Sequence, residues 1–105
     1  MRILVKKTIL HYSNRYPSAS TQIFTWFDEF SKQDFANFNE LKRTYGSASV
    51  VGTERVVFNI KGNEFRLIVS INFRYKACYV IWFGTHRQYD KIDVKTIAFD
   101  ANILN

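Results

Sequence analysis

The sequence predicts an α+β fold, because its apolar residues change their spacing near residue 50. Up to about residue 45, apolar side chains recur every three or four positions, which is typical of helices with one buried face. From Val50 onward they alternate with polar residues, as in strands that are covered on one side. This order favours an N-terminal strand and helices packed on one face of a small, mainly antiparallel sheet.

The length and composition agree with one such domain. The chain has 105 residues, of which 47% are hydrophobic and 17% aromatic, and this is enough to form one core. We therefore interpret residues 1–105 as one domain. No long apolar run is present, so we expect neither a signal peptide nor a membrane-spanning helix. Cys78, the single cysteine, lies in an apolar run, so we expect a buried thiol in a reducing compartment, the cytoplasm.

The helical half divides into three predicted helices behind a short first strand at residues 3–5. The first helix places Val5, Ile9, Tyr12 and Tyr16 on one face, and Pro17 ends it. The second has Ser18 or Ser20 as its N-cap and an apolar stripe of Ile23, Trp26, Phe27 and Phe30. We interpret this stripe as core rather than as a ligand site. The third begins at Asn37, with Glu40 three residues later as in a capping box, and Gly46 ends it.

Three strands are predicted next, over residues 55–60, 65–73 and 78–83, and they form an antiparallel meander. Alternation places Val56, Phe58 and Ile60 on the face toward the helices. Arg55, Asn59 and Arg66 then lie on the opposite face. An arginine in the middle of a strand usually meets an anion or a carboxylate, so this face is a candidate site. For the tail, residues 92–105, we expect an added edge strand or a segment that docks on a partner.

Polar side chains with potential chemistry are concentrated directly after the last strand. Gly84 breaks the apolar run, and Thr85, His86, Arg87, Tyr89 and Asp90 follow it. Groups at the end of a rigid strand are well placed to form a site, although a solvated strand end is the simpler interpretation. The net charge of +6 favours a polyanion such as RNA, or an acidic protein partner. Two isolated histidines and one cysteine do not make a metal site.

Two segments together resemble a known family. Residues 55–68 read RVVFNIKGNEFRLI, and residues 85–90 read THRQYD. These segments resemble the HigB family of bacterial toxins, in the wider RelE-like group, over about residues 2–93. The resemblance implies a compact RelE-like domain and a ribosome-dependent endoribonuclease that cuts mRNA. It also implies neutralisation by a HigA-type antitoxin with a helix-turn-helix domain, and it leaves the oligomeric state open.

The chemistry that the resemblance implies needs no metal or other cofactor. The ribose 2′-OH attacks the adjacent phosphorus, which gives a 2′,3′-cyclic phosphate and a 5′-OH. Arg66 is assigned to the negative charge on phosphorus, His86 to proton transfer, and Tyr89 to base stacking or proton transfer. The residues expected to bind RNA around them are Arg55, Asn59, Asn63, Arg87 and Lys91.

The sequence departs from the family pattern at Ile81, where the family carries an arginine in the last strand. The missing cation leaves a second interpretation open. In that case the chain is a catalytically degenerate toxin fold that binds the antitoxin as a co-repressor module. A general RNA-binding domain is a third possibility. Cleavage requires Arg66 together with His86 or Tyr89, whereas partner binding depends mainly on the helices and on the edges of the sheet.

Overall fold

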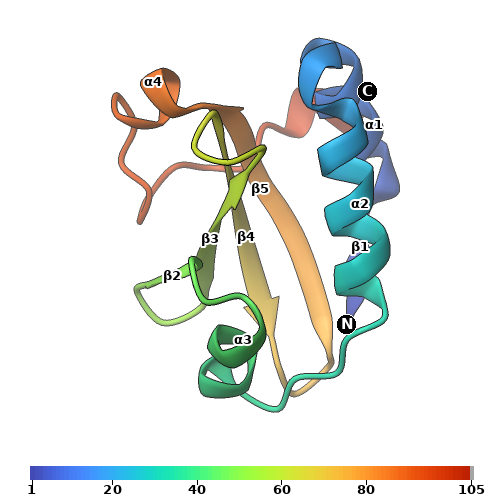
Figure 1. Ribbon diagram of the computed structural model, residues 1–105, viewed down its shortest axis with the longest axis vertical. Coiled ribbons are helices and arrows are strands. Elements are labelled where there is room, and N and C mark those ends of the chain that lie inside the picture. The colour runs from blue at the N-terminus through green and yellow to red at the C-terminus, as the bar shows by residue number, and fades with distance from the viewer. Residues whose placement is uncertain (105) are drawn as a thin grey trace.

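A computed structural model describes residues 1–104 and shows helices packed against a five-stranded sheet (Figure 1). The elements in chain order are β1 (Arg2–Leu4), α1 (Lys6–Arg15), the 3₁₀ helix η1 (Pro17–Ala19), α2 (Ser20–Ser31), α3 (Phe38–Thr44), β2 (Ser49–Val51), β3 (Arg55–Ile60), β4 (Phe65–Asn72), β5 (Ala77–Thr85), α4 (His86–Tyr89) and the 3₁₀ helix η2 (Ala101–Leu104). The helices α1 and α2 lie on one side of the sheet, and α4 lies on the other. The predicted α+β class is confirmed.

The sheet is mixed, with the strand order β1-β5-β4-β3-β2. The meander β3–β4–β5 is antiparallel, as predicted, and β2 adds antiparallel to β3. Within the described residues, β1 and β5 form the only parallel pair, from Arg2 opposite Ala77 to Leu4 opposite Tyr79. Within residues 1–104 no helix is long and apolar enough to cross a membrane.

The core lies between the helices and the sheet face that carries Val56, Phe58 and Ile60. The predicted stripe of α2 is part of it, since Ile23, Trp26 and Phe30 are buried and the partly buried Phe27 packs against the core. Trp26 stacks on Phe30 with the ring centroids 5.1 Å apart, and Phe58 packs against both rings. Aromatic contacts of this kind contribute about 0.5–1.5 kcal/mol beyond the area they bury. The stripe therefore belongs to the core, as predicted.

The helix caps follow the sequence only in part. Asn37 caps α3 as predicted, because its side chain accepts a hydrogen bond from the Glu40 backbone N–H at 3.0 Å. The prediction of Ser18 or Ser20 as the cap of α2 is wrong, since α2 follows η1 directly and its N-cap is Ala19. Ser20 is already helical, and its Oγ lies 2.6 Å from Ser13 Oγ on α1. That hydroxyl joins two helices instead of capping one.

An irregularity in β5 changes which side chains share a face. Val69 lies opposite Val80 and Ile68 opposite Trp82, so Ile81 is an additional residue in a bulge. Simple alternation places Ile81 on one face with Tyr79 and Phe83, and this expectation is wrong for Phe83. Phe83 is buried in the core. Trp82, opposite Ile68, instead joins the sheet face away from α1 and α2.

The tail after α4 folds back onto the chain. The guanidinium Nη1 of Arg55 donates to the carbonyls of Val94 at 3.0 Å and Ile97 at 2.8 Å. Ile103 is buried in the core, and Lys7 Nζ donates to the Leu104 carbonyl at 2.9 Å. The expectation of an edge strand is wrong for residues 92–104, none of which is in a strand. The reason is that the tail uses its apolar residues and carbonyls for contacts with the rest of the chain.

Candidate RNA-binding and catalytic site

The sheet face away from α1 and α2, which we call the outer face, carries the three polar strand residues predicted from alternation. Arg55 lies opposite Ser70, and Asn59 lies opposite Arg66. Directly opposed residues share a face, and the intervening residues Val56 and Phe58 are in the core. The prediction that Arg55, Asn59 and Arg66 lie away from the helices is confirmed.

Arg66 lies beside Tyr89, whose ring is next to Trp82, the residue after the bulge. Its guanidinium carbon is 5.9 Å from the centroid of the Tyr89 ring, which is within range of a cation–π contact. The Tyr89 ring centroid is in turn 6.3 Å from that of Trp82. Nη1 of Arg66 donates to the carbonyls of Asn63 and Phe65, both at 3.1 Å. These contacts orient the guanidinium, while its remaining N–H groups make no hydrogen bond within the described residues.

The turn α4 presents its side chains from a rigid base, because its first residues form a capping box. The Thr85 hydroxyl accepts from the Gln88 backbone N–H at 3.1 Å, and Gln88 Oε1 accepts from the Thr85 backbone N–H at 2.9 Å. The same Oε1 accepts from the Tyr16 hydroxyl at 2.8 Å. The segment between α1 and η1 therefore holds α4 in place at the end of β5.

Gly84 makes this arrangement possible, because it leaves space for two neighbouring side chains. A Cβ atom at residue 84 would lie 2.6 Å from Trp82 Cη2 and 2.7 Å from Gln88 Oε1. Both distances are shorter than real Cβ contacts, so any larger residue would displace the indole or the amide. Gly84 also lies opposite Arg66 in the sheet. Gly84 is therefore next to both the turn α4 and Arg66.

His86 is the first residue of α4 and is half-exposed. Its Nε2 lies 3.5 Å from Asp90 Oδ1, and its backbone N–H donates to the Glu64 carbonyl at 2.9 Å. The first contact orients the imidazole, and the second ties α4 to the turn between β3 and β4. An oriented imidazole at a solvent-accessible strand end can give or take a proton.

The other predicted site residues lie in different settings. Asn63 is exposed in the turn before β4, and its carbonyl accepts from Arg66. Arg87 and Lys91 are exposed, and neither side chain makes a hydrogen bond or ion pair within residues 1–104. Arg55 is different, since its guanidinium binds carbonyls of the tail. The structure therefore groups Arg66, Tyr89, His86, Asn59 and Asn63, and it places Arg55 under the tail.

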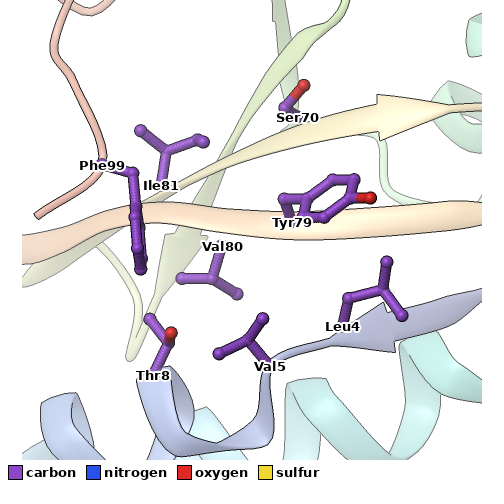
Figure 2. Close-up of a pocket in the computed structure, with 8 residues that line it drawn as sticks. All are labelled: Leu4, Val5, Thr8, Ser70, Tyr79, Val80, Ile81 and Phe99. Atoms are coloured by element: carbon purple, nitrogen blue, oxygen red, sulfur yellow. The ribbon is translucent and has the colours of Figure 1, made fainter. Parts of the chain in front are cut away.

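Ile81 lines an apolar pocket of about 220 Å³ (Figure 2). In this close-up Phe99 from the tail lies next to Ile81, and Val80 points toward Thr8 and Val5 on the side of α1. The pocket presents no charged side chain. At the position where the resemblance implies an arginine, this chain thus has an aliphatic residue in apolar surroundings. Residues 1–104 also contain no group of three or more His, Cys, Asp or Glu side chains placed to bind a metal ion.

Comparison with known proteins identifies the family. Residues 19–92 match the model of the HigB toxin, described as the RelE-like toxic component of a toxin–antitoxin system. The chain belongs to the HigB toxin family. The resemblance seen in residues 55–68 and 85–90 is therefore confirmed.

Several curated HigB proteins are similar to this HigB-family chain. They include the mRNA interferase toxin HigB of Escherichia coli (strain K12) and the mRNA interferase HigB of Escherichia coli O157:H7 and of Shigella flexneri. Each is 26% identical over 92 residues, which cover 86% of this chain and 88% of the relative. The family match contains β3 to β5 and α4, and it ends before the segment that binds Arg55.

Three residues of this HigB-family site were not predicted from the sequence. Trp82 was missed because the bulge reverses its face, and no single-residue pattern marks that bulge. Tyr16 was interpreted only as part of a helix face. Gln88 could have been found, since Thr85 and Gln88 have the spacing of a capping box directly after a strand.

Proposed function

We propose that this HigB-family toxin is a metal-independent endoribonuclease that cleaves mRNA on the ribosome. The names of its relatives, mRNA interferases, support the reaction class. The observation that carries the proposal is the position of the Arg66 guanidinium on the Tyr89 ring, next to a capped turn that begins with His86. A fixed cation, an aromatic ring and a titratable imidazole at one strand end fit RNA cleavage.

The reaction assigned to this site transfers the phosphoryl group within the RNA. The 2′ oxygen loses its proton and bonds to the adjacent phosphorus, while the bond from phosphorus to the 5′ oxygen breaks. The departing 5′ oxygen gains a proton, so the products are a 2′,3′-cyclic phosphate and a 5′-OH. Arg66 stabilises the additional negative charge on phosphorus, and charge stabilisation of this kind contributes about 10²–10³-fold per donor. His86 accepts the first proton or donates the second.

The remaining polar residues bind the RNA chain around the scissile phosphate. Tyr89 offers its ring for base stacking, which contributes about 1–3 kcal/mol per base in single-stranded RNA. Its contact with Arg66 keeps that ring beside the guanidinium to which we assign phosphate stabilisation. Asn59 and Asn63 border Arg66, and Arg87 and Lys91 supply exposed positive charge along α4. Arg55 contributes to phosphate binding only when the tail leaves it.

The partner that this toxin requires is an antitoxin of the HigA type with a helix-turn-helix domain, and both proteins act in the cytoplasm. The family assignment supports an antitoxin partner, and the net charge of +6 favours an acidic one. Co-expression with the protein encoded next to the toxin gene, followed by pull-down, tests the pairing. Recovery of no such neighbour would contradict it.

A second function, a degenerate toxin fold that only binds the antitoxin, is favoured by two observations. Ile81 lies in an apolar pocket where the family carries an arginine. Arg55 is bound to the tail, so of these two outer-face arginines Arg66 is the one left for phosphate. This alternative predicts antitoxin binding and DNA-bound repression without any cleavage.

The experiment that separates the two functions is induction of the chain alone in bacteria, with new 5′ ends mapped on translated messages. The endoribonuclease produces new ends within reading frames and stops growth. The matched control is Arg66→Ala, which should produce no new ends at an equal protein level. An absence of new ends with the native chain would instead favour the antitoxin-binding module.

A further inference from the structure

A groove of about 300 Å³ lies at the opposite edge of the sheet from β1, between α2 and β3. Its walls include Gln22, Trp26 and Glu29 from α2 and the end of β3 from Phe58 to Lys61. The groove exists because β2 is short. It pairs only with Arg55–Val57, and the chain before β2 bends away through a turn in which the Ala48 N–H donates to the Tyr45 carbonyl at 3.0 Å.

The edge of β3 in this groove has an unused pair of backbone groups. The Glu54 carbonyl accepts from the Ile71 N–H at 2.8 Å, so residue 54 points its backbone groups toward β4. Backbone groups alternate along an antiparallel strand, and Arg55, Val57 and Asn59 therefore point toward the outer edge. Arg55 and Val57 lie opposite residues of β2. The N–H and C=O of Asn59 have no hydrogen-bond partner within the described residues, so they form an open position in the ladder.

Two side-chain groups below this edge also lack partners. Trp26 Nε1 is a donor and Gln22 Oε1 is an acceptor, and each is buried without a hydrogen bond in the part of the chain that the structure describes. They belong to residues four apart on α2, so they lie on the same face of that helix. A buried polar atom without a partner costs roughly 1–3 kcal/mol. A molecule with paired donors and acceptors would therefore gain from binding here.

We propose that this groove binds an extended peptide segment of the antitoxin, which adds to β3 as a further strand at Asn59. The inference rests on the antitoxin pairing proposed above and does not depend on RNA cleavage. A peptide supplies the C=O and N–H that Asn59 needs, and addition of a strand to a free sheet edge is a common mode of peptide recognition. The next C=O of the peptide can accept from the indole N–H of Trp26, and its next N–H can donate to the amide oxygen of Gln22. The Gln22 side chain is half-exposed, so it can rotate to make this bond.

The alternation of a strand then defines the residues that the peptide must carry. The residue opposite Asn59 points to the outer face, on the side of Arg66, and an acidic side chain is favoured there. The residues before and after it point into the groove, where Trp26, Tyr45 and Phe58 form an aromatic wall that favours apolar side chains. A segment of the form apolar–acidic–apolar thus fits the edge. The Glu29 carboxylate in the groove disfavours a phosphodiester chain.

The two tryptophans of the chain provide separate signals for an experiment, because Trp26 lines the groove and Trp82 lies next to Tyr89. The probes are synthetic 12-residue peptides that tile the antitoxin, and a ten-nucleotide single-stranded RNA with 2′-O-methyl groups, which cannot be cleaved by 2′-OH attack. Each is titrated into the ¹⁵N-labelled full chain while the two indole N–H signals and the Asn59 amide are followed. We expect one peptide to shift the Trp26 indole and the Asn59 amide and to leave the Trp82 indole unchanged.

Two variants test the contacts. Asn59→Pro removes the backbone donor at an edge position, and Trp26→Phe removes the indole N–H but keeps a ring against Phe30 and Phe58. Each should lower the affinity for the peptide by about fivefold or more, as expected for the loss of one hydrogen bond. If Asn59→Pro does not fold, Trp26→Phe carries the test. Peptide binding that leaves Trp26 and Asn59 unshifted, no peptide binding at all, or RNA that shifts Trp26 would each overturn the inference.

A failure of the peptide-binding inference can be distinguished from a failure of the proposed nuclease activity. A chain that cleaves mRNA but binds no antitoxin peptide at Asn59 contradicts only the groove. A chain that binds the peptide but cleaves nothing contradicts only the nuclease.

Discussion

The hydroxyl of Tyr16 donates to Oε1 of Gln88 at 2.8 Å, across 72 positions of the chain. This bond joins the junction of α1 and η1 to the turn that presents His86 and Tyr89. Gln88 Oε1 also accepts from the Thr85 backbone N–H at 2.9 Å. We interpret Tyr16 and Gln88 as positioning residues, because their hydrogen bonds hold the turn that carries His86 and Tyr89.

The first prediction follows from that bond. Gln88→Met removes the shared acceptor, so the turn loses its fixed orientation. Because His86 and Tyr89 are then no longer held in position for the reaction, kcat for cleavage on ribosomes should fall about tenfold. Gln88→Glu keeps an acceptor for both donors and is the matched control, with kcat near that of the native chain. The message concentration at half-maximal rate should change little in either variant. Equal kcat in both variants would show that the shared bond does not position the site.

Gly84 gives a prediction about stability. Gly84→Ala places a Cβ against the Trp82 ring and Gln88 Oε1, so it should lower the free energy of unfolding by about 1–3 kcal/mol, the usual range for overpacking. Gly46→Ala is the control, because a Cβ there would have no neighbour within 4 Å. Urea unfolding of the two variants checks the difference. A Gly84→Ala chain as stable as Gly46→Ala would contradict the tight packing over residue 84.

The main features of this fold follow from the sequence because they depend on local spacing. The change of apolar period near residue 50 separates helices from strands, and Arg55–Ile60 forms a strand over the predicted residues. The alternation also places Asn59 and Arg66 on one face correctly, because β3 and β4 pair without a bulge. Regular strands thus allow a face to be read directly from the residues.

The features that the sequence did not predict depend on contacts between distant segments. The bulge at Ile81 arises in the pairing of β5 with β4 and reverses the faces of Trp82 and Phe83. Arg55 binds carbonyls 39 and 42 positions away, which no local pattern encodes. The types of side chain in a sequence do not indicate which backbone carbonyls a folded tail will present to an arginine. The same is true of the open edge at Asn59, which depends on where β2 ends.

Ile81 gives a prediction about activity. Ile81→Arg introduces a cation at the position where the sequence resemblance implies one, so the cleavage rate should increase by about 10–100-fold if the rest of the site is assembled. The substitution puts a charged side chain in place of an aliphatic one in apolar surroundings next to Phe99, so we also expect a lower melting temperature. Ile81→Met keeps an apolar side chain and is the control for changes in packing. A rate equal to that of Ile81→Met would show that this position does not contribute to phosphate binding.

Tyr12 makes stability depend on pH in the alkaline range. Burial raises the pKa of Tyr12 from 10.0 to about 12. Because the unfolded state loses this proton first, the contribution to stability is complete below about pH 10 and is lost as pH rises toward 12. Burial also raises the pKa of the Cys78 thiol, which adds to the same loss.

The comparison of Tyr12→Phe with the native chain isolates the phenol, since both retain Cys78. The free energy of unfolding, measured in urea from pH 9 to 12, should fall less steeply in Tyr12→Phe. Tyr75→Phe, which changes an exposed tyrosine, should follow the native curve. Parallel curves for Tyr12→Phe and the native chain would contradict the assignment to Tyr12.

The most direct test of the nuclease is the rate of mRNA cleavage on programmed ribosomes by Arg66→Ala. Its matched control is Arg74→Ala, which removes an exposed arginine between β4 and β5 and no site contact. We predict that the cleavage rate of Arg66→Ala falls by about 10²–10³-fold while its antitoxin binding is unchanged. The rate of Arg74→Ala should stay near that of the native chain, and the product of the native chain should carry a 2′,3′-cyclic phosphate. Equal rates for Arg66→Ala and Arg74→Ala would contradict the assignment of phosphate stabilisation to Arg66.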